Sequence, residues 1–248
     1  MRSLRIAVLA PLLWACSQNP PPASGVGAWE DVSLRMAAFA LGGEYPLAAE
    51  LGLRSDTLPD STLARLLGLR LTLPRRVAVA VLYFPSAQRG ARGWWMHREA
   101  PELSAAMSES TLAALRRIPR VERAIPLPQL VVGDSPSPPG LRTAAARFQA
   151  DVLLVYRPRC SVWERAPFIG RREFRCHCTV EAVVLDTRTG LIPFSIVLAS
   201  ADTTHREGPD VNVEATVLRS QTTATMAALR GVIDSARVFF GSVPERES

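Results

Sequence analysis

Three cysteines in the second half of the chain have the most reactive side chains in the sequence. Cys160, Cys176 and Cys178 flank a polar stretch, and a disulfide, a metal site or a free thiol could be made from them. Residues two apart in a strand share a face, so Cys176 and Cys178 should point to one side of a sheet and His177 to the other. We predict a disulfide from Cys160 to Cys176 or Cys178, which would close a loop of about fifteen residues and contribute about 3 kcal/mol.

The predicted disulfide uses two of the three cysteines and leaves one thiol over, so two alternatives to it stay open. One is a zinc site made from all three cysteines, although strand geometry directs His177 away from them and the spacing is not that of a C-x-x-C pair. The other is a free or redox-active thiol, or a bridge to another molecule. A count of free thiols distinguishes these possibilities.

Other reactive side chains form no catalytic motif that can be recognised from spacing. The histidines at 97, 177 and 205 are far apart and belong to no ligand motif. Ser200 and Asp202 lie near His205 in sequence, but no Gly-x-Ser-x-Gly turn accompanies them. A phosphate-binding P-loop needs a lysine, and the chain contains none. We therefore expect no enzyme activity, no cofactor and no metal.

The fourth cysteine, Cys16, follows a short apolar segment at the N-terminus. Arg2 and Arg5 precede residues 6–15 (IAVLAPLLWA), which are too few to span a bilayer as a helix. The sequence LWAC resembles a bacterial lipobox, in which the cysteine becomes the lipidated first residue of the mature protein. Ser17, rather than aspartate, follows it, which in the bacterial pattern favours the outer membrane. We expect Cys16 to carry acyl chains such as palmitate and to anchor the chain stably in the membrane, facing the periplasm.

The charge and composition of the chain give no indication of nucleic-acid binding. All 29 basic residues are arginine, the formal charge is +6, and the arginines are scattered in pairs. No recognition motif accompanies this charge, so nucleic-acid binding is not expected.

The expected parts are a signal peptide at 1–15, a flexible tether at 16–28, a loosely helical arm at 29–74, one α/β domain at 75–241 and a tail at 242–248 that frays.

Hydrophobic periodicity predicts the elements of that domain. Apolar or alternating runs predict strands, and spacing of three and four predicts helices. The order is strand–helix–strand–helix–strand–strand–strand–helix, which favours an α/β (α+β) fold with a mixed sheet flanked by helices. The expected strands are 76–84, one within 121–132 at a sheet edge, 151–156, 174–185 and 191–201; the expected helices are 101–118, 141–149 and 213–240.

Two turns give the domain a resemblance to known proteins. Ala150-Asp151 connects a helix to an apolar strand, and a later strand ends in the turn Asp186-Thr-Arg-Thr189-Gly190. The region 76–240 resembles the periplasmic α/β domain of the curli-secretion lipoprotein (CsgG) family, the penicillin-binding-protein activator lipoproteins and the TolB N-terminal domain. The resemblance implies a TolB N-terminal-like fold and a role in envelope assembly or regulation of a partner.

A polar excursion between two strands is the expected partner-binding region. It spans 159–175, and its binding candidates are Trp163, Phe168, Arg171 and Arg172. We expect a non-enzymatic, lipid-anchored protein that binds an envelope protein, and self-association is left open. The alternatives are a lipoprotein that binds a small ligand or glycan, a thiol-active envelope enzyme, and a structural subunit of a secretion or efflux machine.

Overall fold

The structure, a computed structural model, describes residues 60–84, 101–132, 137–165, 171–207, 210 and 212–246. The signal peptide, the tether and most of the arm expected at 29–74 lie outside these ranges, as do Cys16 and Phe168. Predictions that concern them stay predictions. Among the described residues, no helix is long and apolar enough to cross a membrane.

The predicted order of strands and helices in the domain is confirmed; α3 lies in the arm that was expected to be loosely helical, and the short helix α5 was not predicted. The elements are α3 (Asp60–Gly68), β1 (Val77–Tyr83), α4 (Pro101–Leu115), β2 (Val121–Pro126), α5 (Gln129–Val132), α6 (Pro138–Arg147), β3 (Val152–Arg165), β4 (Glu173–Asp186), β5 (Phe194–His205) and α7 (Val213–Ser242).

The strands form one mixed sheet in the order β2-β1-β3-β4-β5. β1 runs parallel to both β2 and β3, whereas β3, β4 and β5 are antiparallel. The nearly unbroken apolar sequence of β1 fits its inner position, since a strand covered on both faces needs no polar side. β2 lies at the edge and ends at Pro126, as expected for a residue without an N–H to donate.

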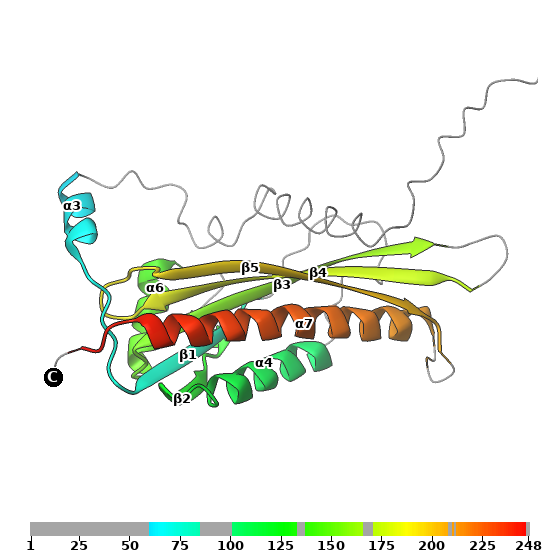
Figure 1. Cartoon of the computed structure of the whole chain (residues 1–248), viewed down its shortest axis with the longest axis horizontal. Coiled ribbons are helices and arrows are strands. Elements are labelled where there is room, and N and C mark those ends of the chain that lie inside the picture. The colour runs from blue at the N-terminus through cyan, green and yellow to red at the C-terminus, as the bar shows by residue number, and fades with distance from the viewer. Residues whose placement is uncertain are drawn as a thin grey trace, which may run out of the picture.

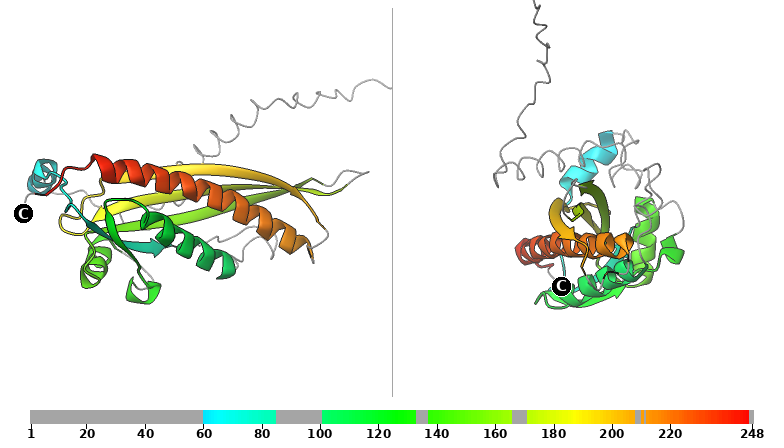
Figure 2. Two further views of the ribbon diagram at one scale, coloured as in Figure 1. Left: turned by 60° about the horizontal axis from the view of Figure 1, so that its bottom comes forward. Right: turned by 90° about the vertical axis from the view of Figure 1, so that its right-hand side faces the viewer.

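Helices cover both faces of this sheet, and each face has its own large hydrophobic core, with a smaller cluster of Phe174, Cys176 and Val217 toward the start of α7. α7 runs along one face with α4 beside it, and α6 lies on the other face (Figures 1 and 2). Alternate residues of β3 enter the two cores: Leu154 and Tyr156 share one core with Val232 of α7, and Leu153 shares the other with Ala145 of α6. Successive side chains of a strand point to opposite faces of the sheet, so a run of adjacent apolar residues needs helices on both faces to bury it.

The two turns that supported the sequence resemblance have structural roles. The Asp151 carboxylate accepts a hydrogen bond from the backbone N–H of Ala78 in β1 at 2.9 Å. The Asp186 carboxylate accepts from the backbone N–H of Thr189 at 2.8 Å and from the Thr189 hydroxyl. Gly190 has a φ of 79°, a left-handed conformation that favours glycine. These carboxylates fix the chain path.

The stretch 159–175, expected to be a polar excursion, consists largely of strand. β3 continues to Arg165 and β4 begins at Glu173, and these two residues are paired. β5 also extends further than expected, to His205, which pairs with Glu173. The excursion prediction was wrong for 159–165 and for Glu173, because polar residues of β3 alternate here with side chains such as Val162, which packs in one cluster with Val217 of α7.

The C-terminal segment beyond α7 is held by the body of the domain. Val243 is buried, and the N–H groups of Leu73 and Arg246 donate to the carbonyls of Pro244 at 3.1 Å and Leu73 at 2.8 Å. The expected fraying of the tail is therefore wrong for 243–246. Glu245 forms a parallel β-bridge with Leu73, in the segment before β1.

One guanidinium group joins these two segments to the end of α7. Arg120, at the turn before β2, donates hydrogen bonds to five backbone carbonyl groups, and one of them, that of Phe240, belongs to the last turn of α7, where carbonyl groups have no partner within the helix. The acceptors are the carbonyls of Phe240 at 2.8 Å, Leu73 at 3.2 Å, Pro244 at 3.3 Å, Pro74 at 3.4 Å and Val243.

Replacing Arg120 should loosen this corner. We expect Arg120→Met to lower the free energy of unfolding by about 2 kcal/mol, because several charge-assisted hydrogen bonds are lost and their carbonyls are only partly rehydrated. Urea unfolding measures the effect. Arg117→Met is the matched control, since Arg117 is exposed nearby and should change the stability by about 0.5 kcal/mol or less. Equal stability of the two variants would contradict this role of Arg120.

Candidate functional site at the distal end of the sheet

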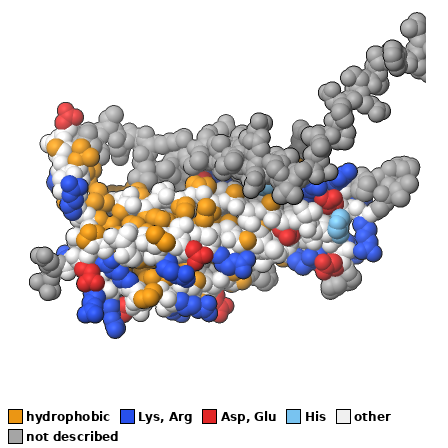
Figure 3. Space-filling model, in the orientation of Figure 1, with side chains coloured by type: hydrophobic (Ala, Val, Ile, Leu, Met, Phe, Trp, Pro, Cys, Tyr) orange, Lys and Arg blue, Asp and Glu red, His pale blue; other side chains and the backbone are white. Residues whose placement is uncertain are grey.

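The longest strands and helix α7 meet at one end of the domain, which we call the distal end. Here β3 ends at Arg165, β4 begins at Glu173, β5 ends at His205 and α7 begins at Val213. On the surface seen in Figure 3, apolar side chains are more frequent toward the other end, and the distal end shows charged side chains, which also occur along the lower edge and at the opposite end. Asn212 starts the helix by accepting a hydrogen bond from the N–H of Ala215 at 2.8 Å.

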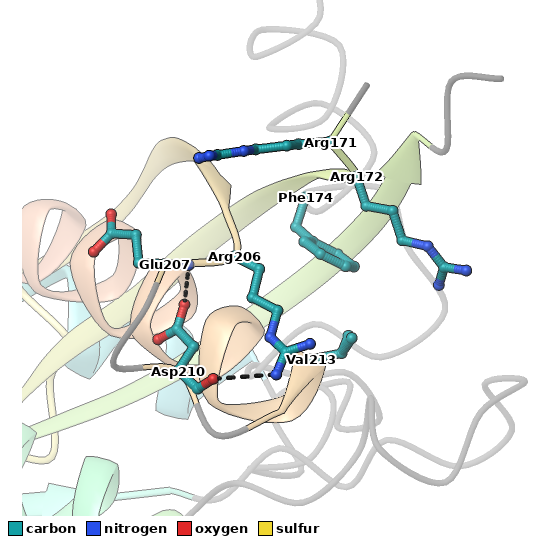
Figure 4. A pocket seen from close by; sticks show the side chains of 7 residues that line it. All are labelled: Arg171, Arg172, Phe174, Arg206, Glu207, Asp210 and Val213. Carbon is teal, nitrogen blue, oxygen red and sulfur yellow. Dashed lines mark hydrogen bonds between the residues drawn. The ribbon is translucent and has the colours of Figure 1, made fainter. Parts of the chain in front are cut away.

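A pocket of about 580 Å³ opens at the distal end. Its walls come from the start of β4, the segment after β5 and the beginning of α7. In Figure 4 the Phe174 ring lies between the side chains of Arg172 and Arg206, and Glu207 points away from it. The lining residues are Arg171, Arg172, Phe174, Arg206, Glu207, Asp210 and Val213.

The acidic wall of the pocket is neutralised by an arginine behind it. Arg219 of α7 forms ion pairs with Asp210 at 3.0 Å and with Glu207 at 3.2 Å. The Asp210 carboxylate also accepts from the Glu207 N–H at 2.9 Å and from the Thr216 hydroxyl at 2.9 Å. The hydrogen bond from Arg219, followed by that from the Glu207 N–H, lowers the pKa of Asp210 to about 2.

This low pKa predicts how the stability of the domain depends on pH. The pKa of Asp210 is lower in the folded chain than in the unfolded chain, so its ionised form stabilises the fold above about pH 4. That contribution is lost as the pH falls through about 2. We expect the Tm of Asp210→Asn to fall less between pH 4 and pH 2 than that of the unaltered protein. Asp234→Asn, on the exposed face of α7, is the control. Identical Tm profiles for Asp210→Asn and the unaltered protein would contradict the prediction.

The structure separates the expected partner-binding residues into two groups. Arg171 and Arg172 line the pocket, and Arg172 also forms an exposed ion pair with Glu164 at 3.1 Å. Trp163 lies on the opposite face of the sheet, where it is 45% exposed and packs edge-on against His177 with ring centroids 5.2 Å apart. Both groups belong to the distal end.

The cysteines adopt one of the two predicted pairings. Cys160 and Cys178 are directly opposite in the β3–β4 register and form a disulfide. This bond excludes a zinc site made from all three cysteines. Cys176 is the free thiol, and its Sγ lies 3.9 Å from the carbonyl oxygen of Val217 in α7, on the opposite side of the sheet from His177, as predicted.

Ser200, Asp202 and His205, which lie close together in sequence, do not form a catalytic group in the structure, and His97 lies outside the described residues. Asp202 accepts a hydrogen bond from the Ser220 hydroxyl at 2.6 Å, and His205 Nδ1 lies 3.2 Å from the Arg172 carbonyl oxygen. Ser200 and Asp202 lie an even number of residues apart in β5, whereas His205 falls on the other face. Across the described ranges, no group of three His, Cys, Asp or Glu side chains is arranged to hold a metal ion.

Several pocket residues could not be found by inspecting motifs. Phe174 lies in an expected strand, and Arg206 and Asp210 lie between the strand expected at 191–201 and the helix expected at 213–240. They approach Arg171 because β5 continues for four residues beyond its expected end at residue 201. The sequence did offer one signal, Asn212, which directly precedes the apolar periodicity of α7. Asparagine is a preferred N-cap residue, so it marks where the segment after β5 ends and the helix that packs on the sheet begins.

Comparisons with known proteins give only distant similarities. No protein-family model and no curated protein sequence matches the chain. Similar solved structures include three bacterial proteins. A hypothetical protein from Chlamydia trachomatis is 13% identical, covers 66% of this chain and 98% of its own, and has a TM-score of 0.41. A minor lipoprotein from Acinetobacter baumannii is 10% identical, with coverage of 67% and 97% and a TM-score of 0.34. PelC from Paraburkholderia phytofirmans, a dodecamer, is 16% identical, with coverage of 65% and 91% and a TM-score of 0.33.

At these identities and TM-scores, the similarities assign neither a family nor a function to this chain. The fold and the pocket define an α/β domain that has an arginine-rich pocket at one end of a mixed sheet. The resemblance to the CsgG, penicillin-binding-protein activator and TolB N-terminal domains stays a prediction.

Proposed function

We propose that this protein is a lipid-anchored lipoprotein of the bacterial outer membrane, whose periplasmic α/β domain binds another envelope protein without catalysing a reaction. The observation that carries the proposal is the distal end, where an arginine-lined pocket and a half-exposed tryptophan occur together. The role of the partner complex is envelope assembly or regulation.

The N-terminal sequence supports the anchor. A basic start, a short apolar segment and Cys16 in the sequence LWAC have the order of a lipoprotein signal peptide. Several acyl chains on one cysteine make membrane attachment stable. The polar, proline-rich residues after Cys16 suit a tether between the membrane and the domain.

The residue types at the distal end support protein binding. Tryptophan and arginine are enriched among the residues that contribute most to protein–protein affinity. Trp163 is half-exposed although it is large and apolar, and Arg171 and Arg172 are exposed at the same end of the β3–β4 pair. The Cys160–Cys178 disulfide and the flanking strand β5 hold this end in a fixed shape.

Thiol chemistry receives less support than binding. Burial raises the pKa of the Cys176 thiol, so the thiolate needed for nucleophilic attack is disfavoured near neutral pH. The volume of the pocket does favour a second candidate function, the binding of a small ligand or glycan, because small-molecule sites commonly occupy about 300–1,000 Å³.

The anchor is tested by fractionating cells that produce the full chain. We expect the unaltered protein to sediment with outer membranes and to incorporate radiolabelled palmitate, whereas Cys16→Ala should do neither. Cys176→Ala is the control, because that thiol lies buried under α7. Unchanged fractionation of Cys16→Ala would refute the anchor.

Partner binding is tested by chemical crosslinking in intact envelopes. We expect one protein to be recovered in a complex with the unaltered chain, and the complex to be lost or reduced at least fivefold in Trp163→Ala or Arg172→Gln. Leu130→Ala on α5 is the control, because Leu130 is 94% exposed away from the distal end. The absence of any protein complex, together with saturable binding of a small ligand, would refute the proposal.

A further inference from the structure

The two edge strands of the sheet, as far as the structure describes it, differ in how they are protected against pairing with another chain. β2 is six residues long, exposes the charged side chains of Glu122 and Arg123, and ends at Pro126. Short length, charge and proline are the devices by which proteins protect a sheet edge. β5 is twelve residues long and contains no proline, lysine or arginine, and its one carboxylate, Asp202, accepts a hydrogen bond from Ser220 of α7. An unprotected edge of this length is suited to pairing with a further strand.

The outer edge of β5 is open to solvent. Within the described ranges, β5 pairs with β4 on one side only. Every second residue of such a strand directs its N–H and C=O away from the sheet. Four exposed side chains of β5 are too small to cover these groups: Ser195, Ala199, Ala201 and Thr203. The edge therefore presents hydrogen-bonding groups that fit the backbone of an extended chain.

The side chains of β5 that face α7 are apolar in the first half of the strand. Phe194, Ile196 and Leu198 pack against the core and are only half-buried. α7 lies directly over them, since a Cβ added to Gly231 would be 2.7 Å from Leu198 Cδ1. Apolar side chains are also frequent on the surface seen in Figure 3 toward the end where β5 begins. A strand added beside β5 would bury the surface that these side chains still expose.

The pattern of β5 favours a different chain as the added strand over a second copy of this one. Residues 194–198 present apolar side chains to the α7 side, whereas the second half presents Ser200, Asp202 and Thr204 to the same side. Antiparallel pairing of two β5 strands about a two-fold axis would place the apolar half of each opposite the polar half of the other. A different segment with apolar residues only opposite 194–198 avoids this mismatch.

We propose that β5 is the docking strand for an extended segment of the envelope partner, which adds a sixth strand to the five-stranded sheet. The segment pairs its backbone with the open edge and places apolar side chains at alternate positions beside Phe194, Ile196 and Leu198. This inference rests on the proposed function, which it makes more specific. β5 ends at His205, whose Nδ1 lies 3.2 Å from the carbonyl oxygen of Arg172, so an added strand leads to the distal end.

Site-specific photocrosslinking in living cells locates the partner on the edge. A photoreactive amino acid replaces Ala199 or Thr203 of β5 in the full chain, and Glu122 on the other edge strand serves as the matched control, because all three side chains are exposed. We expect positions 199 and 203 to crosslink to the same envelope protein as position 172. Position 122 should give at least tenfold less of that adduct.

Charges introduced on the edge should block the added strand. Ala199→Lys/Ala201→Lys places on β5 the residue type that natural edge strands use against pairing. We expect this variant to reduce the envelope complex at least fivefold, whereas Ala199→Ser/Ala201→Ser should change it less than twofold. Both side chains are exposed, so neither variant removes core packing, and Tm measurements confirm that each is folded.

Hydrogen exchange distinguishes strand addition from a contact made through side chains alone. The complex of the full chain and its partner is purified in detergent micelles and compared with the free chain by mass spectrometry. Amides of β5 should exchange at least tenfold more slowly in the complex, because those directed outward then donate to the added strand. Amides of β2 should exchange at the same rate in both samples.

The outcomes separate this inference from the proposed function. Unchanged exchange in β5, or an undiminished complex in Ala199→Lys/Ala201→Lys, would overturn the docking strand. Adducts at positions 199 and 203 that contain only two copies of this chain would overturn it in favour of self-association. If positions 163 and 172 crosslink to an envelope protein and β5 does not, this inference alone fails. If none of these positions gives a protein adduct, the proposed function fails with it.

Discussion

Glu181→Ala should lower the free energy of unfolding by about 3–5 kcal/mol, the largest single-residue effect that we expect. Arg157 of β3 is completely buried, and its Nη2 donates to Glu181 Oε2 of β4 at 2.8 Å. Removal of the carboxylate would leave a guanidinium charge inside the protein without this counter-charge. Chemical denaturation followed by circular dichroism measures the loss.

Two controls isolate the charge effect at this pair. The double variant Arg157→Met/Glu181→Leu should be more stable than Glu181→Ala alone, because apolar residues can replace a buried ion pair at little net cost. The exposed pair of Arg237 and Asp234 on α7 is the matched surface case, and Asp234→Ala should cost about 0.5 kcal/mol or less. A double variant that is as unstable as Glu181→Ala would show that lost packing, rather than the unpaired charge, causes the effect.

Loss of the disulfide should have the second largest effect. We expect Cys160→Ala/Cys178→Ala to lower the free energy of unfolding by about 3 kcal/mol, because the bond restricts a loop between residues 18 apart in the unfolded chain. Urea unfolding of both proteins under oxidising conditions measures the difference. Addition of reductant should bring the unaltered protein close to the stability of the variant.

Thiol counting verifies the bond in the same material. In a Cys16→Ala background, the denatured protein should show one free thiol without reductant, from Cys176, and three with reductant. Three free thiols without reductant would refute the disulfide. A double variant as stable as its parent would instead show that the bond does not stabilise the fold.

The fold class and the order of strands and helices could be predicted from the sequence because their signals are local. The apolar run of β1 and the turn at Asp186 need only a few neighbouring residues to be recognised. The alternation of Leu153 and Leu154 between two cores likewise follows from the period of a strand. Each of these features depends on a pattern within about ten residues, and each corresponds to an element of the structure.

The distal end was predicted less well because its geometry depends on strand register. The choice between Cys176 and Cys178 as partner of Cys160 follows from which residues lie opposite each other, and no local pattern sets that alignment. The pocket likewise forms only because β5 reaches His205 and brings Arg206 beside Arg171. The disulfide partner and the pocket therefore depend on the pairing of residues that are distant in sequence, and the periodicity of a single strand does not predict that pairing.

The most direct test of partner binding at the distal end is site-specific photocrosslinking in living cells. A photoreactive amino acid would replace Trp163 or Arg172 at the distal end, and Arg230 on the exposed face of α7 as a control. Our account predicts that positions 163 and 172 crosslink to the same envelope protein and that position 230 does not. It would be contradicted by the absence of protein adducts at both distal positions, or by adducts that form only at position 230.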